Sequence, residues 1–292
     1  MINQIKEEAC LHGDRISFIA VSRLPEVKKD FEKPGFDYSP YFDFAPGPEA
    51  GWTVRSVITA ASPTRRYSVS FDVDGREFKA IIPASYTDDE EKNNEIIKYL
   101  YAMLRKEGFH VLQGKMLPMK ALAVHTGLGS YGRNNLVYID GFGSFLTLNI
   151  FFTDLAAEDE PFLPFSIMDA CKGCNACVKN CPSGALREEP FCIDAARCLT
   201  GMNEHDGDFP EWVEPSWHNA LVGCESCQLV CPRNRDLLEP VEEISRYNRK
   251  ETEAFLRNEL PYEALEPMGI APYHLNLARN LKCLLEAQGK NH

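Results

Sequence analysis

The sequence predicts an α+β protein: a body of mixed strands and helices, then a cysteine-rich module, then a helical tail. Two features support this division. Only Cys10 of the 11 cysteines lies within the first 160 residues, so the cysteine-rich part is an addition to a separate body. That body alternates predicted strands, local hairpins and helices, which is the pattern of a layered mixed fold. We therefore expect three segments, at residues 1–160, 161–238 and 239–292.

The body begins with a helix and a buried strand. Residues 2–12 suit a short helix, and the apolar run at 16–21 suits a strand. Residues 33–52 are rich in proline, glycine and aromatic side chains, which favours an ordered but irregular loop. Such a loop is either a lid over a binding site or a packed surface arm, and the sequence favours neither. Residues 55–61 form the next predicted strand.

A hairpin and a long helix follow. Residues 67–73 and 78–82 alternate between apolar and polar side chains, and the Asp-Gly pair between them is a favoured two-residue turn. Acidic residues in the first turn and an apolar face then predict a helix within residues 87–108. Strands and helices thus alternate along this part of the chain.

Residues 121–152 combine a helix, a glycine-dense loop and a strand. Gly127, Gly129 and Gly132 allow the backbone to approach a bulky ligand closely. Their spacing matches the dinucleotide fingerprint, but that fingerprint requires a strand, a loop and a helix in this order. Here the predicted helix precedes the glycines and the strand follows them, so we exclude a Rossmann site.

The tail contains two predicted helices, at 251–259 and 274–288, separated by prolines. We expect these helices to pack together as a cap on the rest of the chain.

Two cysteine runs between residues 171 and 231 carry the clearest chemical signal. The first run has the spacing C-x2-C-x2-C-x3-C-P, which is typical of bacterial ferredoxins with two clusters. The second run lacks its first ligand, which Cys198 can supply across a long insertion. In such ferredoxins the last cysteine of each run binds the other cluster. The expected ligands are therefore Cys171, Cys174, Cys177 and Cys231 for one 4Fe–4S cluster, and Cys198, Cys224, Cys227 and Cys181 for the other.

Three other uses of cysteine fit this pattern less well. Structural zinc takes one or two groups of four Cys or His ligands, and it does not explain the spacing of the first run. Disulfide frameworks belong to small secreted chains, and redox-active C-x-x-C pairs usually occur singly. Cys10, Cys192 and Cys283 lie outside the pattern, and we expect them to be buried free thiols.

The charge and hydropathy of the chain limit its partners. The net charge is −12, and adjacent basic pairs in the N-terminal part, such as Lys28-Lys29 and Arg65-Arg66, are few. Because such a field repels polyanions, nucleic acid is not favoured as a partner. The longest apolar stretch, near 145–152, is too short to span a bilayer, and no signal peptide is evident. We therefore expect a cytoplasmic protein with no membrane partner.

Three stretches of the chain match motifs of one known family. Residues 121–134 are similar to A-x-x-x-G-L-G-W-I-G-K-N, and residues 143–155 to G-S-x-x-x-L-G-E-I-x-T-D-L. The cysteine-rich stretch, including 223–234, matches throughout. The chain thereby resembles the epoxyqueuosine reductases, a cobalamin- and iron–sulfur-dependent group related to reductive dehalogenases. The resemblance covers about residues 50–290 and is strongest from 121 to 236.

This resemblance implies a fold and a second cofactor. The fold is a nitroreductase-like α/β core that binds cobalamin, with an inserted ferredoxin-like module that supplies electrons and a helical C-terminal cap. The glycine loop and the turn after it are implied to enclose the corrin. The residues expected to do so are Gly127, Gly129, Gly132, Arg133, Asn134, Asn135, Gly143 and Ser144.

The chain departs from the family where a proton donor is expected. The family has an aspartate at the position of Gln113, and a glutamine cannot release a proton in general acid catalysis. Tyr131, Tyr86 and His125 are candidate replacement acids, although each of these residue types is more often structural. We place Gln113 and Tyr131 near the open face of the cofactor, as the candidate catalytic residues.

These observations favour a cobalamin- and iron–sulfur-dependent reductase whose substrate differs from that of its relatives. Electrons would pass from an external low-potential donor, of flavodoxin or ferredoxin type, through both clusters to cobalt. The acceptor would be a small-molecule substrate or a corrinoid. The alternative is an electron-transfer or corrinoid-handling protein without substrate chemistry of its own, which the missing aspartate favours. Epoxyqueuosine reduction with a relocated acid is a third possibility, to which we give less weight.

Overall fold

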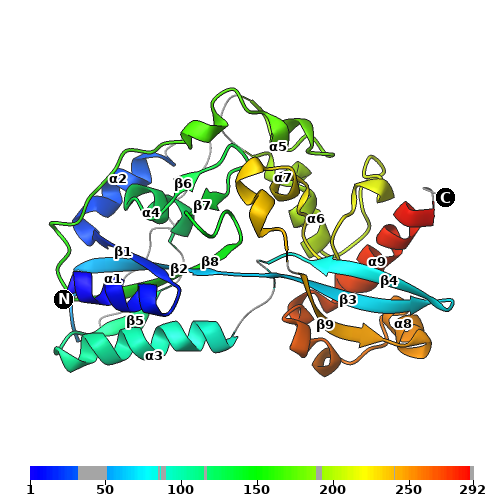
Figure 1. Cartoon of the computed structure of the whole chain (residues 1–292), viewed down its shortest axis with the longest axis horizontal. Coiled ribbons are helices and arrows are strands. Elements are labelled where there is room, and N and C mark those ends of the chain that lie inside the picture. The colour runs from blue at the N-terminus through cyan, green and yellow to red at the C-terminus, as the bar shows by residue number, and fades with distance from the viewer. Residues whose placement is uncertain are drawn as a thin grey trace.

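A computed structural model gives the architecture of the chain (Figure 1). The predicted loop at 33–52 lies almost wholly outside the residues that the structure describes, and so does Cys192. None of the described helices is long and apolar enough to cross a membrane. The structure describes residues 1–31, 51–84, 86, 90–114, 117–188, 193–239 and 241–289.

A four-stranded antiparallel sheet forms the centre of the N-terminal body, in the order β1-β2-β8-β5. Its strands alternate between two buried faces, because successive side chains point to opposite sides. In β8, for example, Phe151 faces one hydrophobic cluster while Ile150 and Phe152 face another. The strand bounds are Arg15–Ala20 (β1), Ser56–Pro63 (β2), Val111–Gln113 (β5) and Leu146–Thr153 (β8).

Helices cover both faces of this sheet (Figure 1). On one face, α1 and α3 contribute Ile5, Ile96 and Leu100 to a cluster with the strands. On the other face, α2 and α4 contribute Val27 and Leu122. The sequence predicted α1, α3 and α4, together with β1, β2 and β8. The helix bounds are Ile2–Leu11 (α1), Leu24–Lys29 (α2), Glu90–Lys106 (α3) and Met119–His125 (α4).

A second, three-stranded sheet has the order β4-β3-β9. The predicted hairpin is present, and Asp74 and Gly75 have positive φ angles of 53° and 81°, as a two-residue turn of this kind requires. The third strand, β9, pairs with β3 in parallel. The strand bounds are Arg66–Val73 (β3), Arg76–Ile82 (β4) and Val241–Tyr247 (β9).

The tail therefore differs from the helical cap that the sequence predicts, because it begins with the strand β9. The two predicted helices follow as α8 (Arg249–Leu256) and α9 (His274–Gly289). A capping box starts α8, in which Asn248 and Glu251 satisfy each other's backbone N–H groups. Both helices pack on the second sheet, at the end of the molecule opposite the N-terminus (Figure 1).

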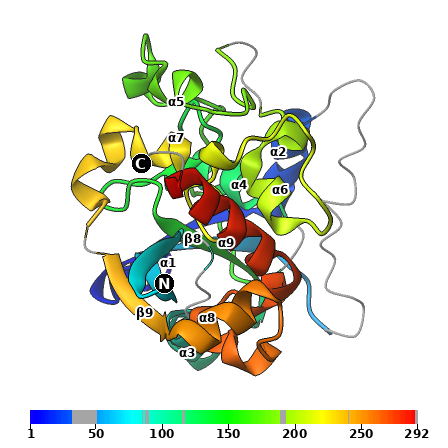
Figure 2. The ribbon, with the colours of Figure 1, turned by 90° about the vertical axis from the view of Figure 1, so that its right-hand side faces the viewer.

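The cysteine-rich segment lies above the junction of the two sheets and contains only short helices (Figure 1). Seen from the side, α6 lies beside α9 (Figure 2), and Asn280 donates a hydrogen bond from α9 to the carbonyl of Asn203 at 3.0 Å. The short hairpin β6–β7 lies beside this segment, on the side of the N-terminal body (Figure 1). The bounds are Ser130–Tyr131 (β6), Val137–Tyr138 (β7), Ala176–Lys179 (α5), Leu199–Glu204 (α6) and Ser226–Leu229 (α7).

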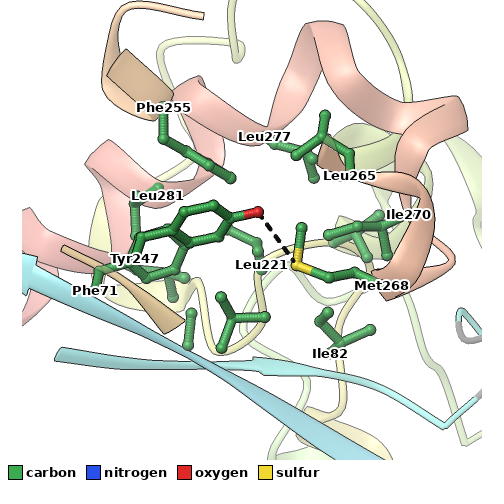
Figure 3. Packing of buried hydrophobic residues seen from close by; sticks show 14 of the residues in the cluster. Phe71, Ile82, Leu221, Tyr247, Phe255, Leu265, Met268, Ile270, Leu277 and Leu281 are labelled. Carbon is green, nitrogen blue, oxygen red and sulfur yellow. Dashed lines mark hydrogen bonds between the residues drawn. The ribbon is translucent and has the colours of Figure 1, made fainter. Parts of the chain in front are cut away.

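One hydrophobic cluster joins all three predicted segments (Figure 3). Phe71 and Ile82 come from the hairpin, Leu221 from the cysteine-rich segment, and Phe255 and Leu281 from the tail. Leu221 is fully buried, and its backbone N–H bonds to the carbonyl of Ile81 at 2.7 Å. The cysteine-rich segment is therefore anchored in the same core as the second sheet.

Leu221→Ala is expected to lower the free energy of unfolding by about 2–5 kcal/mol, because the truncation leaves a cavity where the three segments meet. Leu275→Ala is the matched control, because Leu275 is 55% exposed, and it should change stability by less than about 0.5 kcal/mol. Urea unfolding of both variants measures the difference. Equal stabilities would mean that this cluster does not hold the segments together.

Candidate redox centre

Four cysteines of the first predicted ligand set line a single cavity. They are Cys171, Cys174, Cys177 and Cys231, so the last cysteine of the second run does reach the first run. The cavity has a volume of about 80 Å³, several times the roughly 10–15 Å³ that one water needs. All four residues are half-buried and none is in a disulfide.

Local backbone geometry presents these sulfurs. Gly173 takes a positive φ of 71°, which bends the chain between Cys171 and Cys174. The helix α5 then starts before Cys177 and ends after a single turn. On the facing wall, the backbone N–H of Arg133 donates to Cys171 Sγ at 3.4 Å.

The second predicted ligand set is held around α7. Asn219 donates from Nδ2 to Cys224 Sγ at 3.3 Å and accepts from the backbone N–H of Glu225 at 2.8 Å. Burial, together with the neighbouring thiols of Cys224 and Cys198, raises the pKa of Cys227 to about 12. No described contact joins Cys198, Cys224 or Cys227 to Cys181, which is the fourth predicted ligand of this set. The Sγ of Cys181 lies 3.7 Å from Ser183 Oγ.

The donor chemistry of both sets fits 4Fe–4S clusters. Burial also raises the pKa of Cys177 and Cys224, so their thiolates need a positive partner. Within the described part of the chain, no three Cys, His, Asp or Glu side chains are placed to hold one metal ion. A cubane spreads its four thiolates over four irons, so it does not need ligands converging on a single ion. The four half-buried thiols around the first cavity therefore suit a cluster.

Several residues expected to enclose cobalamin lie against the cysteine-rich segment. Gly132, Arg133 and Asn134 line the cavity of the first cysteine set. Ser144 donates from its backbone N–H to Asn234 Oδ1 at 3.0 Å. A Cβ at Gly143 would clash with the same Asn234 side chain.

Gly127 and Gly129 line a second, larger cavity of about 440 Å³, together with Arg15 and Ser130. This volume lies within the range of about 300–1,000 Å³ that is typical of small-molecule sites. A Cβ at Gly129 would come within 2.8 Å of a backbone carbonyl, so only glycine fits there. The two cavities lie side by side, because four residues line both of them: Tyr138, Met168, Ala170 and Arg233.

The two candidate catalytic residues lie in different surroundings. Gln113 is exposed on the edge strand β5, where its backbone N–H donates to Tyr101 Oη at 2.9 Å. Tyr131 is buried in β6 with its ring 5.3 Å from that of Phe165, and burial raises its pKa to about 12. Asn135, expected at the cofactor, accepts a hydrogen bond at its carbonyl from Lys120 Nζ at 3.0 Å.

The other candidate acids have structural partners. The ring nitrogens of His125 lie 2.7 Å from the carbonyl of Leu163 and 2.6 Å from Asp30 Oδ2. Tyr86 donates to a carboxylate oxygen of Glu204, and burial raises its pKa well above its ordinary value. A raised pKa makes this phenol a weaker acid than an unperturbed tyrosine.

A buried ion pair fixes the second cysteine run to the second sheet. Glu225, between Cys224 and Cys227, is fully buried, and two N–H groups of Arg66 donate to its carboxylate, the shortest bonds being 2.8 and 2.9 Å. Arg66 is the first residue of β3, and it also donates to the carbonyl of Leu238 at 2.9 Å. Sequence reasoning noted Arg66 only as one of an adjacent basic pair and missed this role.

Comparisons with known proteins agree with this site. A 4Fe–4S double cluster binding domain matches residues 170–234. The epoxyqueuosine reductase of Shewanella oneidensis is 30% identical over 195 residues, which is 66% of this chain and 46% of that protein. That of Escherichia coli is 36% identical over 118 residues, which is 40% of this chain and 30% of that protein. The chain belongs to the epoxyqueuosine reductase-like family.

Solved structures of the family share its mixed helix and strand fold. The epoxyqueuosine reductase of Streptococcus thermophilus has a TM-score of 0.67 at 19% identity, over 99% of this chain and 81% of that one. The enzyme of Bacillus subtilis has a TM-score of 0.66 at 20% identity, over 99% and 85%. The matched region nevertheless spans less than half the length of the curated relatives above.

Two cysteines outside the runs can be placed. Cys10 is exposed, so the prediction that it is buried is wrong, because it lies on the outer face of α1 while Ala9 faces the core. Cys283 is half-buried in α9.

Arg66→Met is expected to destabilise the protein by about 3–5 kcal/mol, because it leaves the Glu225 carboxylate buried without a counter-ion. The double variant Arg66→Met/Glu225→Met should recover much of this loss, since no buried charge remains. Arg246→Met, which removes exposed ion pairs to Glu77 and Glu243, should have a much smaller effect on stability. A double-mutant cycle by urea unfolding measures the coupling between Arg66 and Glu225. Additive losses in the free energy of unfolding would contradict this coupling.

Proposed function

We propose that this chain is a cobalamin- and iron–sulfur-dependent reductase that acts on a small-molecule substrate or a corrinoid. The observation that carries the proposal is the cavity lined by Cys171, Cys174, Cys177 and Cys231, because it gathers cysteines from both runs. The family relationship supports an oxidoreductase. We further propose that residues 1–160 form the cobalamin-binding core, with the cluster module at 161–238.

The cysteines would bind two clusters, each through four thiolates, in the two sets that the sequence predicts. N–H groups of Arg133 and Asn219 donate to sulfurs of these sets and thereby stabilise thiolate charge. The electrons would come from an external low-potential donor of the flavodoxin or ferredoxin type. Half-burial of the cysteines limits the access of water to the clusters.

Cobalamin, when bound, would supply cobalt-centred redox chemistry at low potential. Of the residues that the resemblance assigns to it, Gly127 and Gly129 border a cavity of ligand size, and Arg15 adds a positive charge there. These residues would admit and orient part of the cofactor, and the backbone approach that glycine allows suits a bulky group.

The substrate is proposed to differ from that of the relatives. One solved relative holds an epoxyqueuosine-modified tRNA stem loop. This chain has a net charge of −12, which opposes a polyanion, and Gln113 stands where the family has its aspartate. Gln113 is exposed on the edge strand β5, and its amide cannot release a proton as the carboxyl of an aspartate can.

The glutamine at position 113, where the family has its aspartate, favours an alternative function. In this alternative the chain carries electrons to a corrinoid or a partner and has no substrate chemistry of its own. His125 and Tyr86, the candidate replacement acids, are engaged in structural contacts. The two functions differ in whether a substrate is turned over when both cofactors are present.

Anaerobic reconstitution is expected to give about eight irons per chain, and Cys174→Ala to give about half of that or less, since folding and ligation are coupled. Cys283→Ala is the control and should keep the wild-type iron content, because Cys283 lies in α9 outside both runs. Iron and sulfide analysis measures both. Full iron in Cys174→Ala would refute the ligand assignment.

Titration of the reconstituted protein with cobalamin, followed by visible absorption and EPR, tests the second cofactor. Binding near one equivalent, with a base-off Co(II) signal, is the expected result. If eight irons are present but cobalamin does not bind, the reductase proposal fails and the electron-carrier alternative stands.

A further inference from the structure

The loop before α7 holds the side chain of Asn219 against a predicted ligand of the second cluster. Asn219 Nδ2 donates to Cys224 Sγ at 3.3 Å. The same nitrogen donates to Ser226 Oγ at 2.8 Å and to the carbonyl of Trp217 at 3.2 Å. The two N–H groups of this amide therefore serve three acceptors, one of which is the ligand sulfur.

A backbone contact fixes which end of the Asn219 amide faces the sulfur. Asn219 Oδ1 accepts from the backbone N–H of Glu225 at 2.8 Å. A backbone N–H can only donate, so the amide atom opposite it must be the oxygen. Turning the amide over would set two donors against each other and would remove the donor from the sulfur. The hydrogen-bond network thus directs the N–H end of the side chain to Cys224.

The loop that carries Asn219 is held from two sides. The backbone N–H of Leu221 donates to the carbonyl of Ile81 in β4 at 2.7 Å. The carbonyl of Leu221 accepts from Asn280 Nδ2 in α9 at 3.0 Å. Residues 220–222 are fully buried between these elements. The amide of Asn219 therefore meets the sulfur in one fixed arrangement.

Ser226 becomes a second donor once Cys224 is an iron-bound thiolate. Ser226 Oγ lies 3.5 Å from Cys224 Sγ and accepts from Asn219. A thiolate has no proton to give, so a hydrogen bond between these two atoms must use the proton of the serine. Asn219 then acts on Cys224 both directly and through this hydroxyl, and linked hydrogen bonds polarise one another.

We propose that Asn219 is a positioning residue whose hydrogen bonds to Cys224 Sγ and Ser226 Oγ raise the reduction potential of the second cluster. The proposal rests on the cluster assignment made above. The reduced cluster carries more negative charge than the oxidised one, so a donor at a ligand sulfur stabilises the reduced form more, and such hydrogen bonds help to set cluster potentials. The first set has a backbone donor instead, from the N–H of Arg133 to Cys171 Sγ, which no side-chain substitution removes.

The test is an EPR-monitored redox titration of the reconstituted Asn219→Leu variant. Leucine keeps the approximate shape of asparagine but has no N–H group. We expect one of the two cluster potentials to become more negative, with a change on the order of tenfold in the reduction equilibrium, about 59 mV for one electron. The other potential should stay at its wild-type value. Ser226→Ala should shift the same potential in the same direction by a smaller amount.

Asn219→Asp separates the donor role from the structural role of this side chain. Its carboxylate can still accept from the backbone N–H of Glu225, so the loop keeps that contact. The carboxylate has no N–H for Cys224, and its negative charge also disfavours the reduced cluster. We therefore expect a shift at least as large as that of Asn219→Leu. This variant keeps the test decisive if Asn219→Leu does not fold.

Asn276→Ala is the matched control, because Asn276 is also a buried amide but its Nδ2 donates to the carbonyl of Glu204 at 2.7 Å. It should leave both potentials unchanged. Full iron in Asn219→Asp with unchanged potentials would overturn the proposal. Loss of one cluster from both Asn219 variants would also overturn it, because the amide would then hold the loop for ligation and not set a potential. A wild-type protein that takes up no 4Fe–4S cluster would instead refute the cluster assignment, and this proposal with it.

Discussion

The buried ion pair between Arg66 and Glu225 fixes the cysteine-rich segment to the rest of the chain. Removing two charges from water costs several kcal/mol for each ion, and only good geometry and further hydrogen bonds offset that cost. Here two N–H groups meet the carboxylate, and a third reaches a carbonyl. Because Glu225 lies between two predicted ligands and Arg66 opens β3, the ligand loop and the second sheet have one stable arrangement relative to each other.

The same arrangement brings the glycine loop to the clusters. Gly132 and Asn134 form a wall of the first cysteine cavity, and Gly143 leaves room for Asn234. These residues thus join the body to the redox module, while Gly127 and Gly129 face a separate cavity next to it. A single loop therefore borders both the first cysteine cavity and a ligand-sized space.

Local patterns predicted most elements of the fold, including the hairpin at Asp74 and both helices of the tail. The crossing of Cys231 to the first run also followed from spacing alone. The strand β9 was missed because Val241–Tyr247 contains more charged and polar than apolar residues and pairs with a strand far away in sequence. The Arg66–Glu225 pair was missed for a related reason: it joins distant segments, and no local periodicity encodes such a contact.

The parallel pairing of β3 with β9 has a consequence for the order of synthesis. The hairpin of β3 and β4 leaves the ribosome early, but β9 follows only after the whole cysteine-rich segment. Until then one edge of β3 is open, and open edges invite pairing with other chains. The nascent protein must therefore protect this edge during the same interval in which its thiols are free to receive iron and sulfide. The topology of a sheet that contains no cysteine thus sets the interval in which the strand edge and the thiols of the nascent chain are open together.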